Sequence, residues 1–269
     1  MPESDSVFAG SIPENYDRRM VPLIFEPYAA DLARRVSALS PRRVLETAAG
    51  TGVVTRMLWP QLGPDAEYTA TDLNPPMLEY AASLLTDPRV RWRAADALDL
   101  PFPGATFDVV LCQFGAMFFP DRIRAFGEAL RVLTPDGTFL FSVWDAIEKN
   151  DFAAVITDAL AAMFPADPPR FLARTPHGYH DIGRIRQDVE AAGFGTVTIE
   201  TVTAQSVAPS ALEAATAYCH GTVLRTEIEG RDAGALNAAT SRATAALAAR
   251  FGDGEVRGRI QAHVVTASA

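Results

Sequence analysis

The chain has 269 residues, of which 48% are hydrophobic and 21% are charged, a composition typical of folded globular proteins that excludes a disordered chain. Acidic residues outnumber basic ones by 33 to 24, and the net charge of −9 argues against non-specific binding to nucleic-acid phosphates. No apolar run approaches the roughly 20 residues that a membrane span requires.

Individual residues exclude further classes of protein. Lys149 is the only lysine, and Asn150 follows it, so the sequence contains no Gly-Lys-Ser/Thr phosphate loop. Asp145 lies four residues before Lys149, which also excludes the Tyr-x-x-x-Lys pair of many reductases. Cys112 and Cys219 are too far apart for a Cys-x-x-Cys site and are expected to be buried thiols. The first ten residues, MPESDSVFAG, lack the apolar core of a signal peptide, so we expect a cytoplasmic protein.

The first half of the chain alternates between predicted helices and strands. Residues 21–39 carry apolar side chains at spacings of three and four, which predicts a helix that ends before Pro41. The elements that follow are a strand at 43–46, a helix at 53–62, a strand at 67–71, a helix at 76–85, strands at 90–94 and 107–112, a helix at 123–133, a turn at 134–137 and a strand at 138–144. Continuous apolar strands alternating with helices predict a doubly wound, Rossmann-like α/β fold with a mostly parallel sheet.

The second half is less regular. We expect a helix at 149–164, a loop at 165–181, a helix at 182–192 closed by Gly193, a strand at 196–207, Ala-rich helices near 209–225 and 233–250, and a last strand at 259–266. No internal repeat or linker divides the chain, which predicts one domain over residues 1–269. Within it, residues 1–40 form an N-terminal lid and helix, residues 41–145 a cofactor-binding core, and residues 146–195 and 208–252 helical insertions that form a cap.

Three acidic residues follow three successive predicted strands. Glu46 precedes a turn that contains Gly50 and Gly52, Asp72 ends the second strand, and Asp96 follows the third. Glycine allows the backbone to approach a ligand closely, and a carboxylate after the second strand can bind both hydroxyls of a ribose. Asp72 or Asp96 alone could cap a helix or turn, but the three together at strand ends predict an adenosine site.

The turn is not the fingerprint of dinucleotide binding. That fingerprint requires a small residue three positions after the second glycine, where this chain has Thr55. Glu46 would also repel a pyrophosphate, whereas it suits a ligand that carries an amino group. Adenine, ribose and an amino-acid tail together describe S-adenosylmethionine.

With these motifs the sequence resembles class I S-adenosylmethionine-dependent methyltransferases, in the broad group similar to the ubiquinone/menaquinone-biosynthesis (type 11) enzymes. The resemblance covers residues 40–145 and rests on the segments 44–52 (VLETAAGTG), 71–74 (TDLN), 95–97 (ADA) and 107–110 (FDVV). The chain departs from the family in having Ala48 where the first of three glycines is usual. The resemblance implies a seven-stranded sheet whose last strand, near 259–266, is antiparallel.

The resemblance also implies roles for individual residues. Glu46 would face the amino group of the methionine part, Asp72 the ribose, Leu73 the adenine ring and Asp96 the adenine amino group. Gln113 and Phe114 would lie near the methionine part and its methyl group, and Tyr16 would belong to a lid, although it could equally be a surface residue before a helix. The complete set of expected cofactor-binding residues is Tyr16, Glu46, Thr47, Ala48, Gly50, Gly52, Asp72, Leu73, Met77, Ala95, Asp96, Ala97, Gln113 and Phe114.

The segment Asn74-Pro75-Pro76-Met77 is similar to a motif of DNA methylases that act on amino groups. In those enzymes the motif follows the fourth strand and ends in an aromatic residue that stacks on a flipped base. Here it follows the second strand and ends in Met77, so we interpret it as the start of a helix. This observation and the acidic charge argue against a nucleic-acid substrate.

The sequence does not identify a catalytic residue. An oxygen acceptor can require a general base, and His177, His180 and His220 are the candidates because imidazole titrates near neutral pH. Their alternative is a structural role, with His177 and His180 decorating a surface loop. Too few ligands cluster in the sequence to predict a metal site.

The apolar segment 116–119 and the helices after residues 149 and 209 favour a small aromatic or lipophilic methyl acceptor. The expected reaction is an in-line displacement on S-adenosylmethionine, and a homodimer is compatible with the sequence. Two alternatives stay open: a protein that binds S-adenosylmethionine without turnover, and a nicotinamide-dependent reductase.

Overall fold

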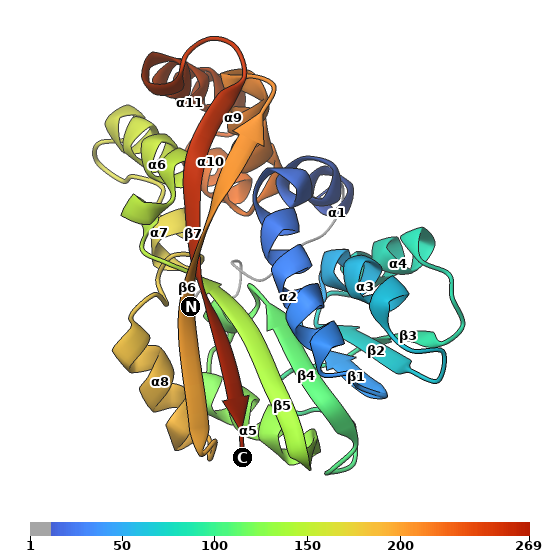
Figure 1. The fold of residues 1–269 in the computed structure, drawn as a ribbon. Helices are drawn as coiled ribbons and strands as arrows, with labels where there is room; N and C mark the ends of the chain where they lie inside the picture. Colours follow the sequence, from blue (N-terminus) through green and yellow to red (C-terminus); the bar gives the residue numbers. More distant parts are fainter. Residues whose placement is uncertain (1–11) are drawn as a thin grey trace.

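Seven strands form one mixed sheet in residues 12–269, the part of the chain that the computed structural model describes (Figure 1). The order across the sheet is β3-β2-β1-β4-β5-β7-β6. The strands are β1 (Arg43–Glu46), β2 (Glu67–Asp72), β3 (Val90–Ala94), β4 (Phe107–Gln113), β5 (Leu133–Trp144), β6 (Thr196–Ala208) and β7 (Val256–Ser268). Strands β1 to β5 pair in parallel, whereas β7 is antiparallel to both β5 and β6, which confirms the predicted fold. The segment tested for a signal peptide, residues 1–10, and the start of the expected lid lie outside the described residues.

Helices cover the sheet and gather beyond one of its ends. They are α1 (Ile12–Asn15), α2 (Glu26–Ala38), α3 (Val53–Leu58), α4 (Pro75–Leu84), α5 (Arg122–Val132), α6 (Asp151–Met163), α7 (Phe171–Arg174), α8 (Ile182–Ala191), α9 (Ala211–Gly221), α10 (Leu224–Arg231) and α11 (Leu236–Phe251). Within the described range, the prediction missed α1, α7 and α10. These short segments lie before an expected helix, inside an expected loop and after an expected helix, respectively.

The N-terminal helical segment begins earlier than its apolar pattern predicts. Residues Tyr16–Phe25 are wound as a π-helix, labelled η2, and α2 continues from it without a break. Pro22 lies inside this segment and has no N–H to donate to the carbonyl group four residues earlier, so ordinary α-helical bonding fails there. The wider π-helical turn accommodates the proline and brings Tyr16 over the strand ends.

The predicted turn at 134–137 is assigned to strand β5, but it interrupts the pairing of that strand. Phe107 pairs with Leu133, and the next pair along the ladder joins Val109 to Thr138. The residues between Leu133 and Thr138 therefore bulge out of the ladder, which is where the Pro-Asp-Gly sequence disfavours regular pairing.

Strands β6 and β7 extend beyond the rest of the sheet as a two-stranded arm. Trp144, the last residue of β5, pairs with Ala262, so residues 256–261 of β7 pair only with β6. Helices α6 and α11 contact this end of β7, and α9 packs on α11 and on the π-helix (Figure 1). Helix α8 instead lies along β6 and contacts α5, so it covers the sheet, although it belongs to the expected insertion 146–195.

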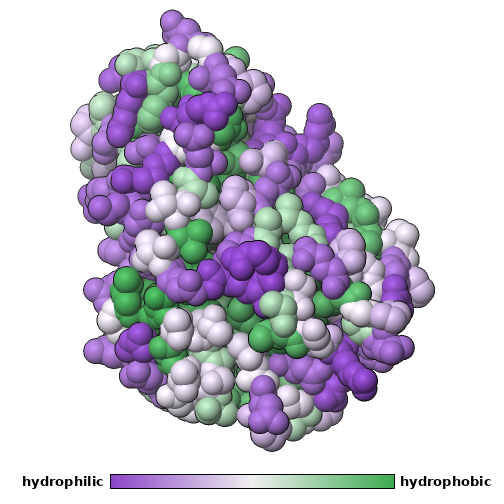
Figure 2. Space-filling model, in the orientation of Figure 1, coloured by the Kyte–Doolittle hydropathy of each residue, from purple (hydrophilic) through white to green (hydrophobic). Residues whose placement is uncertain are grey.

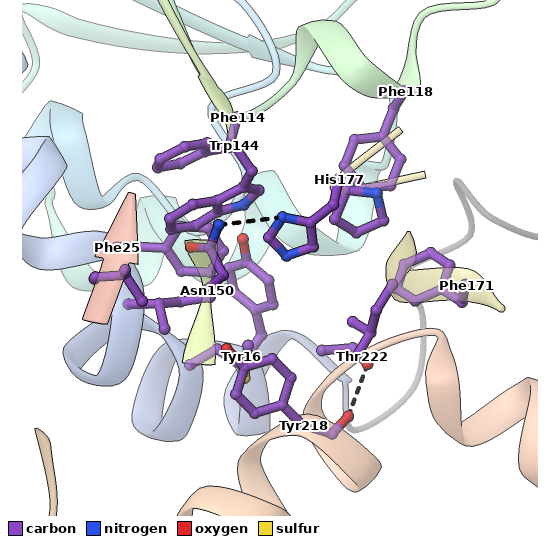
Figure 3. A pocket seen from close by; sticks show the side chains of 15 residues that line it. Tyr16, Phe25, Phe114, Phe118, Trp144, Asn150, Phe171, His177, Tyr218 and Thr222 are labelled. Carbon is purple, nitrogen blue, oxygen red and sulfur yellow. Dashed lines mark hydrogen bonds between the residues drawn. The ribbon is translucent and has the colours of Figure 1, made fainter. Parts of the chain in front are cut away.

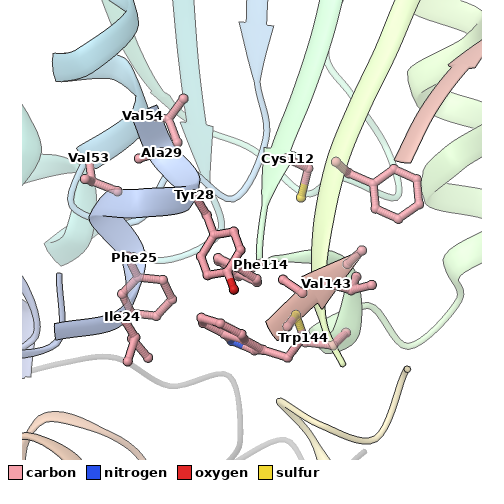
Figure 4. Packing of buried hydrophobic residues seen from close by; sticks show 14 of the residues in the cluster. Ile24, Phe25, Tyr28, Ala29, Val53, Val54, Cys112, Phe114, Val143 and Trp144 are labelled. Carbon is pink, nitrogen blue, oxygen red and sulfur yellow. The ribbon is translucent and has the colours of Figure 1, made fainter. Parts of the chain in front are cut away.

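An aromatic cluster fills the space between the ends of β4 and β5 and helix α2. The rings of Phe114 and Trp144 stack with centroids 3.9 Å apart and planes inclined by only 7°. Tyr28 presents its edge to both rings, and Phe25 packs against both from the end of the π-helix (Figure 4). All four side chains are buried, so this cluster fixes the strand ends relative to the N-terminal helix.

The exposed face drawn in Figure 2 mixes hydrophilic and hydrophobic residues, with apolar side chains scattered over it. None of the helices described between residues 12 and 269 is both long and apolar enough to cross a membrane.

Replacing Gly52 by alanine should lower the free energy of unfolding by about 2–4 kcal/mol. Gly52 has a φ of +77°, and a Cβ atom there would lie 2.7 Å from Cη2 of Trp92. A Gly127→Ala variant serves as control, because Gly127 lies inside α5 with no atom within 4 Å of an added Cβ, and this change should raise stability by about 0.5–1 kcal/mol. Urea denaturation measures the free energy of unfolding of both variants and of the wild type. A Gly52→Ala variant as stable as the wild type would contradict the packing described here.

Candidate active site

The carboxyl ends of the parallel strands meet at one edge of the sheet. Glu46 at the end of β1 pairs with Ala70 and Leu111 of the flanking strands, and Asp72 at the end of β2 pairs with Ala94. Gln113 at the end of β4 pairs with Ser142 of β5. The loops that follow these strands are consequently neighbours, as expected for a ligand site in an open α/β sheet.

A cavity of about 1130 Å³, counting its open mouth, lies along this edge, and we call it the strand-end cavity. Its wall includes most of the residues that the sequence predicts for the cofactor. These are Tyr16, Ala48, Gly50, Asp72, Leu73, Met77, Ala95, Asp96, Ala97, Gln113 and Phe114. Leu73 is 59% exposed although it is apolar, and it offers a surface on which a planar ring can lie.

Asp72 organises two of the loops around the strand-end cavity. Its carboxylate accepts hydrogen bonds from the backbone N–H of Gly50, at 2.8 Å, and from the backbone N–H of Asn74, also at 2.8 Å. Burial raises the pKa of Asp72, while these donors act to lower it. The carboxylate thus joins the glycine turn after β1 to the start of α4.

At the floor of the strand-end cavity, the backbone of the loop after β1 lies close to that of the loop after β4. Ala48 has a φ of +52°, a conformation in which the glycine usual in the family would be unstrained. Gly115, after β4, faces it, and a Cβ atom at Gly115 would lie 2.4 Å from the Cβ of Ala48. The two loops can therefore meet only because Gly115 has no side chain.

Three expected cofactor residues do not line the strand-end cavity. Gly52 packs beneath Trp92, and its left-handed conformation serves the start of α3. Thr47 is buried, and its backbone N–H donates to the carbonyl of Leu111. Both have structural contacts that account for their presence without a ligand. Glu46 belongs to a smaller adjoining cavity.

The adjoining cavity is lined by Glu46, Gln113 and Tyr16 together with residues of the glycine turn, and we call it the side cavity. Oε2 of Glu46 accepts hydrogen bonds from Oγ1 of Thr55, at 2.5 Å, and from the hydroxyl of Tyr68, at 2.6 Å. Burial raises the pKa of Glu46 to about 7, against the effect of these two donors. The carboxyl group is therefore poised between its neutral and charged forms near neutral pH.

The polar atoms around the side cavity fit the amino-acid part of the expected cofactor. Oε1 of Gln113 and Oγ1 of Thr51 are buried and have no hydrogen-bond partner among the described residues. A buried oxygen atom without a hydrogen bond is unfavourable unless a ligand donates one, and an ammonium group is a suitable donor. Together with the carboxylates of Glu46 and Asp72, these atoms supply acceptors of the kind that the amino and hydroxyl groups of the expected cofactor require.

A second cavity of about 600 Å³ adjoins the strand-end cavity on the side of α7 and α9, and we call it the aromatic cavity (Figure 3). Tyr16, Phe114 and Phe118 line both cavities and form the border between them. The remaining wall of the aromatic cavity comes from the π-helix, β5, α7, α9 and β7, and from the residues that precede α6 and follow α7 and α9. It consists of Met20, Ile24, Phe25, Trp144, Asn150, Phe171, Leu172, Pro176, His177, Tyr218, Thr222 and Ile260.

The three candidate histidines are in different places. His177 is buried and lines the aromatic cavity. His180 is exposed, and its Nδ1 contacts the carbonyl of His177 at 2.8 Å. His220 faces α11, where its Nε2 lies 3.0 Å from Oγ1 of Thr240. Only His177 of the three lines either cavity.

Several residues of the strand-end cavity were not predicted to bind the cofactor, although Phe118 and Phe119 belong to the apolar segment 116–119 that was expected near the acceptor. They are Asn74, Leu98, Gly115, Phe118, Phe119 and Pro120. Asn74 and Leu98 directly follow predicted residues, and Gly115 follows Phe114, so extending each strand-end motif by one or two positions would have found them. Phe118 is placed by the short 3₁₀ turn Ala116–Phe118, whose apolar sequence indicated a place near the acceptor but not in the wall shared with the cofactor.

The comparisons with known proteins agree with this geometry. The family model "Methyltransferase domain" matches residues 45–141. The ubiquinone/menaquinone biosynthesis C-methyltransferase UbiE of Ralstonia pickettii is 34% identical over 176 residues, which cover 62% of this chain and 72% of that protein. A demethylmenaquinone methyltransferase of Thermus thermophilus is 38% identical over 136 residues, covering 48% of this chain and 61% of that protein.

A solved structure, that of the YcgJ protein of Bacillus subtilis, superposes with a TM-score of 0.57 at 17% identity. The superposition covers 90% of this chain and 97% of that one. At this identity the likeness concerns the fold alone.

Replacing Asp72 by alanine should weaken the binding of S-adenosylhomocysteine by about 1.5–3 kcal/mol, because a hydrogen-bonded carboxylate is lost from the strand-end cavity. Isothermal titration calorimetry measures the affinity, and circular dichroism checks that the glycine turn tolerates the change. Asp136→Ala is the matched control, since Asp136 is exposed in the bulge of β5 and lines neither cavity. Unchanged affinity in a folded Asp72→Ala protein would exclude the role of Asp72.

Proposed function

Because the chain belongs to the class I S-adenosylmethionine-dependent methyltransferases of the ubiquinone/menaquinone C-methyltransferase type, we propose that it methylates an uncharged aromatic small molecule held in the aromatic cavity. Its membership makes it a methyltransferase that uses S-adenosylmethionine and acts on a small-molecule acceptor. The acceptor's chemical class and the placement of both ligands are the proposal.

In this proposal the cofactor lies along the strand-end cavity. Asp72 binds the ribose hydroxyls, Leu73 and Met77 contact the adenine ring, and Asp96 accepts from the adenine amino group. The amino group of the methionine part reaches the side cavity, where Glu46 and Oε1 of Gln113 accept its hydrogen bonds. The bound group supplies an activated methyl on a sulfonium, so the chain need only position the acceptor in line with it and exclude water.

The composition of the aromatic cavity is the observation that carries the choice of acceptor. None of its described lining residues is Asp, Glu, Lys or Arg, so a carboxylate or phosphate on the acceptor would have no charged partner there. Burying such a charge without a partner is costly, whereas a planar apolar ring gains from contact with Phe118, Phe171 and Tyr218. The cavity therefore favours an uncharged aromatic molecule.

The names of the relatives support the same class. The enzymes from Ralstonia pickettii and Thermus thermophilus are named for ubiquinone/menaquinone biosynthesis and for demethylmenaquinone, which are molecules with an aromatic or quinone ring and a lipophilic chain. The acidic net charge of this chain continues to argue against a nucleic-acid acceptor.

Binding of the cofactor should release a proton from Glu46 near pH 6.5. Burial raises the pKa of Glu46 to about 7, and an ammonium group beside the carboxylate would lower it again because it favours the charged form. Calorimetric titrations with S-adenosylhomocysteine in buffers of different ionisation enthalpy should show this release, and Glu46→Gln should abolish it. Equal proton release by the variant would place the amino group elsewhere.

The same pKa shift predicts how stability depends on pH in the absence of ligand. Because the folded protein holds the proton of Glu46 more tightly than the unfolded chain does, this group's contribution is fully present below pH 4.5 and is lost as the pH rises through about 7. The free energy of unfolding of the Glu46→Gln variant should therefore change less between pH 5 and pH 8 than that of the wild type. Urea denaturation at both pH values measures this difference.

Filling the aromatic cavity should separate acceptor binding from cofactor binding. Leu172→Trp adds an indole ring to the wall of the aromatic cavity and should reduce methyl transfer to reduced demethylmenaquinone analogues at least tenfold, while S-adenosylhomocysteine binds as before. Leu212→Trp is the matched control, because Leu212 is 53% exposed on α9. Transfer of labelled methyl groups is the measurement. If neither the wild type nor the control methylates uncharged aromatic compounds but both methylate anionic ones, the proposed acceptor is wrong.

A further inference from the structure

His177 is a buried imidazole on the wall of the aromatic cavity. Its relative exposure is 6%, and it lies in the loop between α7 and α8, where its backbone N–H donates to the carbonyl of Leu172 at 3.0 Å. The imidazole contacts the ring of Trp144, with centroids 6.0 Å apart. The loop and the tryptophan together give the imidazole one orientation.

The hydrogen bonds of His177 determine which ring nitrogen carries the proton. Nδ1 lies 2.8 Å from the backbone carbonyl oxygen of Asp145. A carbonyl oxygen can only accept, so Nδ1 must be the N–H donor of this pair. The side-chain amide of Asn150, 3.5 Å from Nδ1, donates to the same carbonyl oxygen at 3.3 Å and does not compete for the proton. In the neutral ring, Nε2 therefore has a free lone pair.

Nε2 of His177 has no hydrogen-bond partner in residues 12–269. Figure 3 shows the ring held on one side by Asn150, with its other side turned toward the interior of the aromatic cavity, where Tyr16 and Tyr218 lie. Nε2 is not among the fully buried atoms that lack a partner, so it is accessible from the cavity, where the hydroxyl group of a ligand can donate a hydrogen bond to its lone pair.

We propose that His177 is a catalytic residue whose Nε2 accepts the hydrogen bond of a hydroxyl group on the aromatic acceptor and receives its proton during methyl transfer. This role rests on the proposed function, because it requires the acceptor to occupy the aromatic cavity. It specifies that the acceptor carries a hydroxyl group on its ring, and that Nε2 of His177 is the atom that binds this group.

The proton and the electrons balance in a simple way. As the new bond from the acceptor's oxygen or ring carbon to the methyl carbon forms, the methyl–sulfur bond would break and its electron pair would stay on sulfur, which leaves as a neutral thioether. The acceptor becomes positively charged, so its hydroxyl becomes strongly acidic. The O–H bond then breaks, its electron pair stays on oxygen, and the proton forms the Nε2–H bond of an imidazolium. Where a ring carbon is methylated, loss of the hydroxyl proton gives a dienone, which regains its aromatic ring by later loss of the ring C–H proton and return of a proton to oxygen. The carbonyl of Asp145 keeps its hydrogen bond from Nδ1 throughout.

The surroundings of His177 favour its neutral, accepting form before the reaction. The charged or titratable groups that act on it are Glu148 and Asp145, which favour protonation, and His180, which disfavours it. Desolvation outweighs the others and lowers the pKa of His177 to about 4. A hydroxyl bound by this ring should accordingly bind equally well from pH 8 to pH 5.5, and protonation near pH 4 should abolish the interaction.

Contacts of the Asp145 side chain hold this residue in place, and with it the backbone carbonyl that accepts the hydrogen bond from His177. Its carboxylate accepts from Nε2 of Gln261 at 2.6 Å and lies 3.2 Å from Nε2 of His263, both on β7. Asn150 also donates to the carbonyl of Gln261 at 3.2 Å. These contacts tie the end of β5 to the arm, and Asp145 and Asn150 act as positioning residues for His177.

Nuclear magnetic resonance of the imidazole nitrogens tests the tautomer without any acceptor. The chain has four histidines, and the resonances lost in His177→Phe identify those of residue 177. We expect a protonated Nδ1 and an unprotonated Nε2 that stay unchanged from pH 8 to pH 5.5. A protonated Nε2, or a titration near the ordinary pKa of about 6.5, would overturn the proposal.

Binding of 1-naphthol and of 1-methoxynaphthalene, measured by calorimetry with S-adenosylhomocysteine present, tests the hydroxyl contact. The wild type should prefer the naphthol by roughly three- to tenfold, the value of one hydrogen bond, and His177→Phe should bind both alike. His220→Phe is the matched control, since His220 lines neither cavity, and it should keep the preference.

The outcomes distinguish the two proposals. If both compounds bind and His177→Phe keeps the preference for naphthol, the role of His177 is wrong while the proposed acceptor class stands. If neither compound binds the wild type, or if both bind it and Leu172→Trp binds them just as well, the compounds do not occupy the aromatic cavity; the acceptor class is then wrong and the role of His177 fails with it.

Discussion

The stack of Phe114 on Trp144 is the contact on which both cavities depend. Phe114 follows β4 in a left-handed conformation, with a φ of +52°, and Trp144 ends β5. Such a conformation costs a non-glycine residue about 1–3 kcal/mol and persists only where its surroundings hold it. Here the stacked rings, with Tyr28 against their edges, supply that constraint. Because Phe114 faces the cofactor side and the aromatic side at once, the strain is located at the border between the two proposed ligands.

The order of strands and helices could be predicted from the sequence because β4 and β5 contain long apolar runs and the intervening helices begin and end at recognisable turn residues. The prediction for 90–94 has the bounds of β3, and that for 43–46 those of β1. Prediction failed where the cause is not local. The π-helix depends on Pro22 inside an otherwise ordinary amphipathic segment, and α10 has charged residues on most of its surface, so its periodicity is weak. The placement of α8 against the sheet depends on tertiary contacts that no pattern within residues 182–192 records.

The two parts of the site differ in how far the sequence could predict them. The strand-end cavity is built from residues that directly follow strands, so the strand-end rule gathers Gly50, Asp72 and Gln113 without knowledge of the fold's details. The aromatic cavity is built from the π-helix, α7, α9 and β7, elements that are distant in sequence and carry no shared motif. Of the three histidines proposed for it, geometry selects His177, because the loop after α7 turns it inward while His180 remains exposed.

Burial shifts the pKa values of Glu46 and His177 in opposite directions, and in both residues it favours the neutral form. Desolvation raises the pKa of the carboxyl group to about 7 and lowers that of the imidazole to about 4, because in each case it disfavours the charged form. The two groups then respond differently to ligands. A cationic amino group beside Glu46 would restore its charge, since opposite charges a few ångströms apart favour ionisation of the acid. No charged side chain lines the aromatic cavity among the described residues, so His177 stays a neutral acceptor until a proton is released by the reaction itself. The chain thereby keeps its charge on the cofactor side and leaves the acceptor side uncharged, which is the arrangement that transfer from a cationic donor to a neutral ring requires.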